Sequence, residues 1–495
     1  MYHPPTKRVR FLRKFTVLSI MTIVVLSGAI ILVALTLGYS FTAEDGGRIQ
    51  RGGIMQLDSK PTGATVTING AQFGSRTPAK LASQTGEYSV SMTRDGYLPW
   101  QKTIPIHTSS ISWVTYPRLI PEERKPESVA SYPATVASAL PSGSSRYYAV
   151  LESESNPVVS IARLDSDTVQ TEEVALPRTL YTDPTPERPL SHFSIERWAG
   201  NDKRLLLSHT YGEGAKEWIL LDLDQPEDSV NITSHLGISG AMSEPVFSVN
   251  DGSELYALID GDVRIIDLDR QTLSRPLVQD VVVFSLYGNG FILFTQQDES
   301  GVQSVGYVKE DYREPRIIDT IENSSTEPSQ LSIGKYFDKY YFLITNGPEA
   351  KLSSSRNLPD NSTAELERTH QKTLQLENAI IHSNITDNGQ LAMVQDGTSF
   401  STYNLELDRL SSAQVVNEGS PSTQILKHLD RYLLWGVNEG ALRTYEFDGE
   451  NQYDVMPVKH RFGATLSPNG KYLYALADSA EDGEGIALTR LQLLP

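Results

Sequence analysis

The chain has 495 residues, with 43 Lys and Arg against 61 Asp and Glu, a net charge of −18, and 39% of its residues are apolar. This length is too great for one small domain, and the apolar fraction is sufficient for packed cores. The absence of Cys excludes disulfide scaffolds, thiolate metal sites and cysteine nucleophiles, and the acidic balance excludes general binding of nucleic acid, whose phosphates require Lys and Arg.

The N-terminal residues are typical of a membrane anchor. Residues 1–15 are a basic tail, and the 29 residues from Phe15 to Ala43 carry no formal charge. Because about 20 apolar residues in a helix cross the hydrocarbon layer, we predict a transmembrane helix over residues 16–41 that contacts membrane lipid. A buried core helix would rarely run so far without a polar face.

The charges on either side of this span predict its orientation. Five cations and no acid precede it, whereas Glu44 and Asp45 follow it. The positive-inside rule therefore places the N-terminus in the cytoplasm and the rest of the chain, with a net charge of −23, outside the cell membrane. The alternative is a cleaved signal peptide, but its apolar region normally has only 7–15 residues, and cleavage after Ala43 would leave bulky Phe41 three residues before the cut.

A polar tether over 42–53 leads to a predicted small β domain over 54–118. Val66 and Ile68 alternate with polar residues, as do Tyr88, Val90 and Met92, which is the period of a strand. Asn69-Gly70 between two such segments is a strong hairpin signal, because both residues tolerate positive φ. We expect about six short strands.

The ordered motifs of this segment resemble the PEGA domain. The resemblance is carried by Ser59-Lys60-Pro61-Thr62-Gly63-Ala64 and by later matches, with Thr62 in place of the usual Glu and one extra residue before Thr77-Pro78. It implies a β-sandwich-like module found in envelope and surface-layer-associated proteins. The residues it singles out are structural and not catalytic: Pro61, Gly63, Ala64, Asn69, Gly70, Thr77, Pro78, Gly96 and Tyr97.

Four aromatic residues of this domain allow two interpretations. They could form a contact face for sugar or protein, or they could fill a small core and line a strand edge. The residues are Tyr97, Trp100, Trp113 and Tyr116.

After a Pro-rich, charged linker over 119–131, residues 132–495 repeat one pattern of strand, tight turn and hydrophobic strand. Eight turns recur at a mean spacing of about 47 residues, which is the signature of a β-propeller of seven or eight blades. The hairpin Ser467-Pro468-Asn469-Gly470-Lys471 resembles the TolB/WD40-like propellers. The turn residues are Gly143, Asp202, Gly252, Asn289, Asp338, Asn388, Asp430 and Asn469.

One repeat is interrupted by a longer, more polar segment over 345–379. Ser362 followed by Glu365 resembles a capping box, which predicts a short helix over Thr363 to Gln371. Long propeller insertions often carry binding, but a solvated loop is an equal alternative.

The sequence contains no local catalytic, nucleotide-binding or metal-ligand motif, and we therefore expect neither an enzyme nor a cofactor or metal site. Clustered acidic residues could hold Ca²⁺ in loops, although none matches a known calcium loop. These are Asp222/Asp224, Asp260/Asp262, Asp267/Asp269 and Glu481/Asp482/Glu484.

The sequence therefore predicts a mostly β, single-pass membrane protein of the cell envelope that binds or scaffolds an envelope protein or a cell-wall polymer. One alternative is a hydrolase or lyase acting on envelope glycan or peptide, with carboxylates from distant repeats meeting in the propeller channel. Another is a structural subunit of an envelope assembly.

Overall fold

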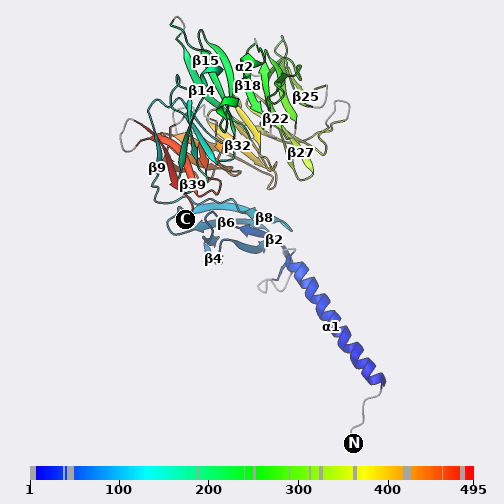
Figure 1. The fold of residues 1–495 in the computed structure, drawn as a ribbon. Helices are drawn as coiled ribbons and strands as arrows, with labels where there is room; N and C mark the ends of the chain where they lie inside the picture. Colours follow the sequence, from blue (N-terminus) through cyan, green and yellow to red (C-terminus); the bar gives the residue numbers. More distant parts are fainter. Residues whose placement is uncertain are drawn as a thin grey trace. The chain divides into compact units, whose positions relative to one another are not determined.

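The computed structural model describes residues 7–36, 39–41, 49–186, 189–238, 240–248, 252–288, 290–310, 314–322, 327–359, 365–415, 425–459, 461–479 and 485–495. The chain divides into two compact units, Met1–Glu123 and Arg124–Pro495. Figure 1 shows that strands dominate the fold beside one long helix. The mostly β fold with an N-terminal apolar helix was predicted from the sequence and is confirmed.

The long helix α1 runs from Lys7 to Thr36 (Figure 1). Its segment Phe15–Val33 has a mean hydropathy of 2.6, and none of it is buried by protein. Its 19 residues rise about 28 Å, which matches the roughly 30 Å hydrocarbon layer. The helix begins before residue 16 because the Arg, Lys and Leu of the basic tail favour helix. It ends at Thr36 and not near residue 41, since Gly38 follows and Tyr39–Phe41 forms the short strand β1.

The first unit contains a small β domain made of two sheets. One sheet has the order β4-β3-β6-β7, and in the other β2 pairs with β1, β5 and, in parallel, β8. A core lies between them, with Met55, Val66, Met92 and Trp100 among its buried side chains. The strands are β2 (Ile49–Leu57), β3 (Thr65–Ile68), β4 (Ala71–Arg76), β5 (Ala79–Gln84), β6 (Gly86–Thr93), β7 (Trp100–Ile106) and β8 (Ile111–Val114).

Two local predictions for this domain can be compared with the structure. Asn69 and Gly70 form the β3–β4 turn with φ values of 49° and 81°, as the hairpin signal indicates. The tether predicted over 42–53 overlaps β2, which begins at Ile49 because its residues pair with β1 and then with β5. Residues 42–48 lie outside the described residues.

The second unit is a succession of four-stranded antiparallel sheets, which we name blades 1–8 in chain order. Blade 1 comprises β10 (Ser138–Pro141), β11 (Tyr147–Leu151), β12 (Val158–Arg163) and β13 (Gln170–Ala175), and blade 2 comprises β14 (Ser191–Trp198), β15 (Arg204–Tyr211), β16 (Ala215–Asp222) and β17 (Val230–Asn231). Blade 3 comprises β18 (Met242–Phe247), β19 (Glu254–Ile259), β20 (Asp262–Asp267) and β21 (Thr272–Leu273), and blade 4 comprises β22 (Val281–Tyr287), β23 (Phe291–Gln297), β24 (Gln303–Lys309) and β25 (Arg316–Ile321). The short helices η2 (Arg178–Leu180), η3 (Pro226–Asp228) and α2 (Ile232–His235) belong to connections of blade 2 and its neighbours.

Blades 5–8 repeat this plan. Blade 5 comprises β26 (Leu331–Tyr336), β27 (Lys339–Asn346), β28 (Glu349–Ser355) and β29 (Thr369–Gln375), and blade 6 comprises β30 (His382–Ile385), β31 (Leu391–Gln395), β32 (Ser399–Asn404) and β33 (Arg409–Gln414). Blade 7 comprises β34 (Lys427–His428), β35 (Leu433–Asn438), β36 (Ala441–Glu446) and β37 (Tyr453–Pro457), and blade 8 comprises β38 (Ala464–Leu466), β39 (Tyr472–Asp478), β40 (Ile486–Gln492) and β9 (Glu127–Tyr132).

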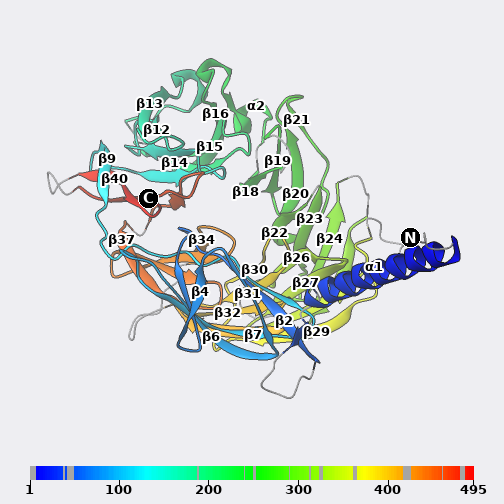
Figure 2. The ribbon, with the colours of Figure 1, turned by 90° about the horizontal axis from the view of Figure 1, so that it is seen from below.

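The described residues therefore form a β-propeller of eight blades, which decides between the predicted seven and eight. Figure 2 shows the sheets following one another around a centre. Buried apolar clusters join successive blades, and one cluster joins the last blade to the first through Tyr148, Tyr474 and Leu488. Each blade is apolar on both faces, so stacking in a closed ring is what buries them.

The ring is closed by β9, which pairs with β40 as the outer strand of blade 8. Residues 119–131 were predicted as a linker, but Glu127–Tyr132 belong to this blade. The reason is that β40 would otherwise present an unpaired edge, and the start of the domain supplies the missing strand. Seven of the eight predicted turn residues connect the first and second strands of their blades, and the eighth, Asn289, lies outside the described residues.

The segment 345–379, which was predicted to interrupt a repeat, contains two strands of blade 5. It contains β28 and most of its length is ordinary blade structure, including β29. The helix predicted over Thr363 to Gln371 is wrong where the structure describes it, because Thr369–Gln375 pairs with β28 and residues 365–368 are not helical. Sheet pairing outweighs the local helical preference here. Ser362 and Thr363 lie outside the described residues.

Candidate functional site

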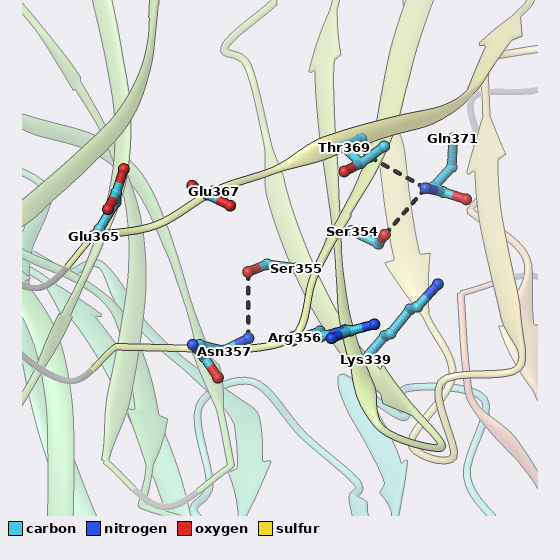
Figure 3. Close-up of a pocket in the computed structure, with 9 residues that line it drawn as sticks. All are labelled: Lys339, Ser354, Ser355, Arg356, Asn357, Glu365, Glu367, Thr369 and Gln371. Carbon is cyan, nitrogen blue, oxygen red and sulfur yellow. Dashed lines mark hydrogen bonds between the residues drawn. The ribbon is translucent and has the colours of Figure 1, made fainter.

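A polar cavity of about 490 Å³ lies in blade 5, at the ends of β27, β28 and β29. Figure 3 shows the side chains that line it, which come from the start of β27, the end of β28 and the residues on either side of the β28–β29 connection. We call it the blade 5 pocket. Its lining residues are Lys339, Ser354, Ser355, Arg356, Asn357, Glu365, Glu367, Thr369 and Gln371.

Charges of opposite sign face each other across the blade 5 pocket. Lys339 and Arg356 lie on one side, and Glu365 and Glu367 lie opposite them on the irregular segment just before β29 (Figure 3). Within the described part of the chain, these four side chains form no hydrogen bond or ion pair. Unpaired charges with hydroxyl and amide groups between them are suited to a polar ligand that carries its own charged or hydroxyl groups.

The remaining lining groups are partly held in place. Gln371 Nε2 donates to Ser354 Oγ at 3.1 Å and to the Thr369 carbonyl at 3.3 Å. The backbone N–H of Asn357 donates to Ser355 Oγ at 3.3 Å. These bonds fix the orientation of the Gln371 amide while its carbonyl oxygen stays available as an acceptor.

The β28–β29 connection is anchored to blade 4. Leu358 and Leu366 pack against the apolar cluster between blades 4 and 5. Tyr307 of blade 4 donates its hydroxyl to the Pro359 carbonyl at 2.8 Å, and Arg368 donates to the Ile318 carbonyl. These contacts explain how residues 365–368, which have no regular secondary structure, can present Glu365 and Glu367 at a defined position.

Phe337 occupies the β26–β27 turn, two residues before Lys339. Its φ is +52° and its side chain is 80% exposed. A bulky residue in the left-handed region is strained, and glycine is the residue normally found at such a turn position. An exposed aromatic ring held at a strained position beside a polar pocket is a candidate contact residue.

The alternative prediction, a catalytic site in the propeller channel, requires carboxylates from distant repeats that meet in one cavity. A cavity of about 150 Å³ lies at blades 4–6, lined by residues such as Ser285, Gln330 and His382. Its lining contains no carboxylate. Gln330 Nε2 donates to the Ile381 carbonyl at 3.0 Å and its Oε1 accepts from the Ser383 amide at 3.0 Å, so this side chain joins neighbouring blades.

Blade 2 contains a buried chain of polar groups that no sequence motif indicates. Ser191 Oγ lies 2.9 Å from His209 Nε2, and His209 Nδ1 lies 2.7 Å from Glu217 Oε1. This order of groups is that of a serine hydrolase. However, His209 is fully buried and stacks on Phe193 with ring centroids 3.9 Å apart, and Ser191 lines neither the blade 5 pocket nor the cavity at blades 4–6.

Glu217 connects this chain to the β13–β14 connection and to β17. Its carboxylate accepts from the Thr182 amide at 2.8 Å, from Thr182 Oγ1 at 3.2 Å and from Asn231 Nδ2 at 2.8 Å. Burial alone would raise the pKa of Glu217, but the hydrogen bonds from His209, Thr182 and Asn231 hold it below its ordinary value. The ionised carboxylate of Glu217 accepts hydrogen bonds at both oxygens and in this way links β15, β17 and the β13–β14 connection to β16. The feature that could have indicated this contact is the register of the β15–β16 hairpin, which places His209 opposite Glu217.

The acidic pairs considered for calcium do not form such a site in the described part of the chain, where no group of three or more His, Asp or Glu side chains is placed to hold a metal ion. Asp222 instead pairs with Arg204 at 3.3 Å, and Asp267 pairs with Arg270 at 3.3 Å. Residues 481–484 lie outside the described residues.

Several of the motif residues of the small β domain meet in one knot of hydrogen bonds. Ser59 Oγ donates to the Pro61 carbonyl and lies 2.7 Å from Thr77 Oγ1, which accepts from the Ala64 amide at 2.9 Å. The Gly63 amide donates to the Thr77 carbonyl at 2.8 Å. These bonds join the β2–β3 connection to the chain between β4 and β5, next to Pro78.

The other motif residues lie apart from this knot. Asn69 and Gly70 form the β3–β4 turn, and Asn69 Oδ1 accepts from the Ser89 amide at 2.9 Å. Gly96 has a φ of 79° in the β6–β7 connection, where the Arg94 guanidinium lies 5.7 Å from the Tyr97 ring centroid. All of these contacts shape turns and connections between strands.

The comparison with protein families agrees with this arrangement: the family model described as the PEGA domain matches residues 53–118. Residues 53–118 are a PEGA domain. The aromatic residues of the PEGA domain differ in their exposure. Trp100 is buried and contacts Tyr116 edge-to-face, with ring centroids 6.1 Å apart, whereas Trp113 on the edge strand β8 is 50% exposed beside Ile111.

The solved structures that resemble this chain include the Dos1 propeller, Hsv2p and the tricorn protease. The Dos1 propeller has a TM-score of 0.44 and 10% identity, covering 76% of this chain and 95% of that chain. Hsv2p from Kluyveromyces lactis has a TM-score of 0.34 and 10% identity, covering 72% and 99%. The tricorn protease has a TM-score of 0.39 and 11% identity, covering 74% of this chain and 38% of that chain. Comparison with curated proteins gave no significant match. The propeller assignment rests on the eight-sheet topology and its closure.

Proposed function

We propose that this protein is a single-pass membrane protein whose extracytoplasmic propeller binds a cell-wall polymer or an envelope protein through the blade 5 pocket. The anchor in this proposal is α1, whose apolar side chains in Phe15–Val33 are exposed and therefore require lipid. The five cations before the span favour a cytoplasmic N-terminus. A cleaved signal peptide is the competing role for the same helix.

The observation that carries the binding role is the set of unpaired opposite charges in the blade 5 pocket. Lys339 and Arg356 suit carboxylate or phosphate groups, and Glu365 and Glu367 suit amino groups. The hydroxyl and amide groups between them suit the hydroxyls of a sugar chain. Phe337 adds an apolar ring at the neighbouring turn on which a sugar face or an apolar side chain can rest.

A hydrolase acting on envelope glycan or peptide is the alternative, and the presence of two free carboxylates in one pocket favours it. Glycosidases need their two carboxyl groups on opposite sides of the scissile bond. Glu365 and Glu367 instead lie on the same segment, with cations opposite them (Figure 3). This arrangement supports binding over glycoside cleavage.

The test measures binding of the full chain in detergent to insoluble cell wall and to soluble wall fragments of the host cell. We compare K339A/R356A and E365Q/E367Q with E349Q/K351A, which changes an exposed ion pair of 3.4 Å in the same blade but outside the pocket. Charge-assisted hydrogen bonds contribute about 1.5–3 kcal/mol, so we expect at least one pocket pair to weaken binding about tenfold or more.

The expected result includes near-wild-type binding by the E349Q/K351A control. Equal binding by all three variants would show that the blade 5 pocket is not the ligand site. Turnover of a wall fragment that E365Q/E367Q abolishes would replace the binding role with the hydrolase.

A further inference from the structure

A second cavity, of about 220 Å³, opens between blades 2 and 3 on the side of the propeller where β16 and β20 end. We call it the blade 2–3 groove. Residues of α2 and of the turn after β20 form its two rims, and His235 Nε2 lies 2.6 Å from Gln271 Oε1 between them. The groove is formed by different blades from the blade 5 pocket.

The floor of the blade 2–3 groove is apolar. Leu220, Ile232 and Ile266 are at most 5% exposed beneath it. Leu236 and Leu268 are only partly buried and pack on the same apolar cluster that joins the two blades. A ligand that covers these two leucines would remove apolar surface from water, which is the main favourable contribution to such contacts.

The rim of the groove is acidic. Asp222 and Asp267 each have an arginine partner at 3.3 Å. The carboxylates of Asp228 and Asp269 also line the groove, and neither forms a hydrogen bond or ion pair with the described residues. Two uncompensated negative charges beside an apolar floor complement a ligand with a cation next to an apolar group.

The charge of the whole domain acts in the same direction. Residues 124–495 contain 30 Lys and Arg against 54 Asp and Glu, a net charge of −24, whereas residues 44–123 have a net charge of +1. A field of this sign favours cationic partners at a site whose own rim is acidic, as the rim of this groove is. An anionic wall polymer or an anionic lipid surface is therefore a poor occupant for this groove.

We propose that the blade 2–3 groove is a docking site for a segment of another protein in which a leucine-like side chain is next to Lys or Arg. The apolar side chain covers Leu236 and Leu268, and the cation lies between Asp228 and Asp269. A cavity of about 220 Å³ accommodates one or two such side chains and not a folded domain, so the occupant is a short exposed peptide segment.

The experiment measures fluorescence anisotropy of three labelled tetrapeptides, Leu-Lys-Leu-Lys, Leu-Glu-Leu-Glu and Ser-Lys-Ser-Lys, with the full chain in detergent. The variant D228N/D269N removes the two free charges, and L268N removes part of the floor. The matched control is E172Q/E173Q, which neutralises two exposed carboxylates on β13 of blade 1. Intrinsic fluorescence checks that each variant is folded.

We expect the Leu-Lys peptide to bind tightest, and its affinity to fall about five- to tenfold in D228N/D269N, since each exposed ion pair contributes modestly. The same loss is expected in wild type at high salt and in L268N, with less than a twofold change in E172Q/E173Q. K339A/R356A should leave this affinity unchanged, which separates the groove from the blade 5 pocket. Equal binding of the Leu-Glu or Ser-Lys peptide, or an equal loss in E172Q/E173Q, overturns the proposal.

Discussion

Replacing Glu217 with Gln tests whether the buried Ser191–His209–Glu217 chain stabilises the fold. The glutamine keeps the volume of the side chain but places an NH₂ group where one carboxylate oxygen now accepts hydrogen bonds. If the NH₂ group takes the place of Oε1, it faces two other donors, His209 Nδ1 and the Thr182 backbone amide. If it takes the place of Oε2, it faces the donor Asn231 Nδ2. A buried group left unsatisfied costs about 1–3 kcal/mol, so we expect E217Q to lower the free energy of unfolding by about 2 kcal/mol.

E217A removes all four hydrogen bonds to the carboxylate and should cost about 3–5 kcal/mol, because His209 and Asn231 are left buried without their partner. The assay is urea unfolding of the full chain in detergent, followed by Trp fluorescence, for which Trp198 and Trp218 in the same blade are local reporters. E172Q on the exposed edge of blade 1 is the control and should change stability by less than about 0.5 kcal/mol.

The dependence on pH provides an independent check. The folded-state pKa of Glu217 lies below the unfolded value, so its contribution to stability is present above the unfolded pKa of about 4.3 and is lost as the pH falls through the folded pKa. The difference between wild type and E217Q should therefore shrink in acid. Wild-type stability of E217Q at pH 7, together with an esterase activity that S191A abolishes, would refute the structural role.

Other predictions follow from the same structure. G389A should lower the free energy of unfolding by about 2 kcal/mol or more, because Gly389 has a φ of +72° and a Cβ there would lie 2.2 Å from the Lys335 carbonyl oxygen; urea unfolding measures this. D396N should cost about 1–3 kcal/mol at pH 7, because the buried Asp396 accepts six hydrogen bonds, and the loss should vanish in acid. F337G should raise the urea midpoint by relieving the positive φ while weakening ligand binding. Deleting residues 127–132 should lower the urea midpoint strongly, since β40 loses its outer partner.

Local chemistry made most of the fold predictable. Each blade turn contains Asn, Asp or Gly at a regular spacing, and apolar strands follow, so both the repeat and its size could be read from residues such as Asn388 and Asn469. The closing strand β9 could not be predicted in this way. Its partner β40 is more than 350 residues away, and nothing in the short segment Glu127–Tyr132 indicates that partner.

The candidate sites were less predictable, because they depend on how distant residues meet. Lys339 and Glu365 have no recognisable spacing, and they face the same pocket only because β27 and β29 flank β28. The capping-box pattern at Ser362 suggested a helix, while the pairing of β28 with β29 decided otherwise. His209 and Glu217 were detectable only through hairpin register, and their partners Thr182 and Asn231 had no signal at all.

Cysteine labelling tests whether α1 anchors the chain in the membrane and leaves the propeller outside. The chain has no Cys, so a single introduced Cys reports one position without background. A membrane-impermeant maleimide is applied to cells whose outer barrier has been permeabilised, with S155C in the exposed β11–β12 loop and T6C in the basic tail. We expect labelling of S155C in these permeabilised but unlysed cells, and labelling of T6C only after lysis. Protection of S155C until lysis would contradict it.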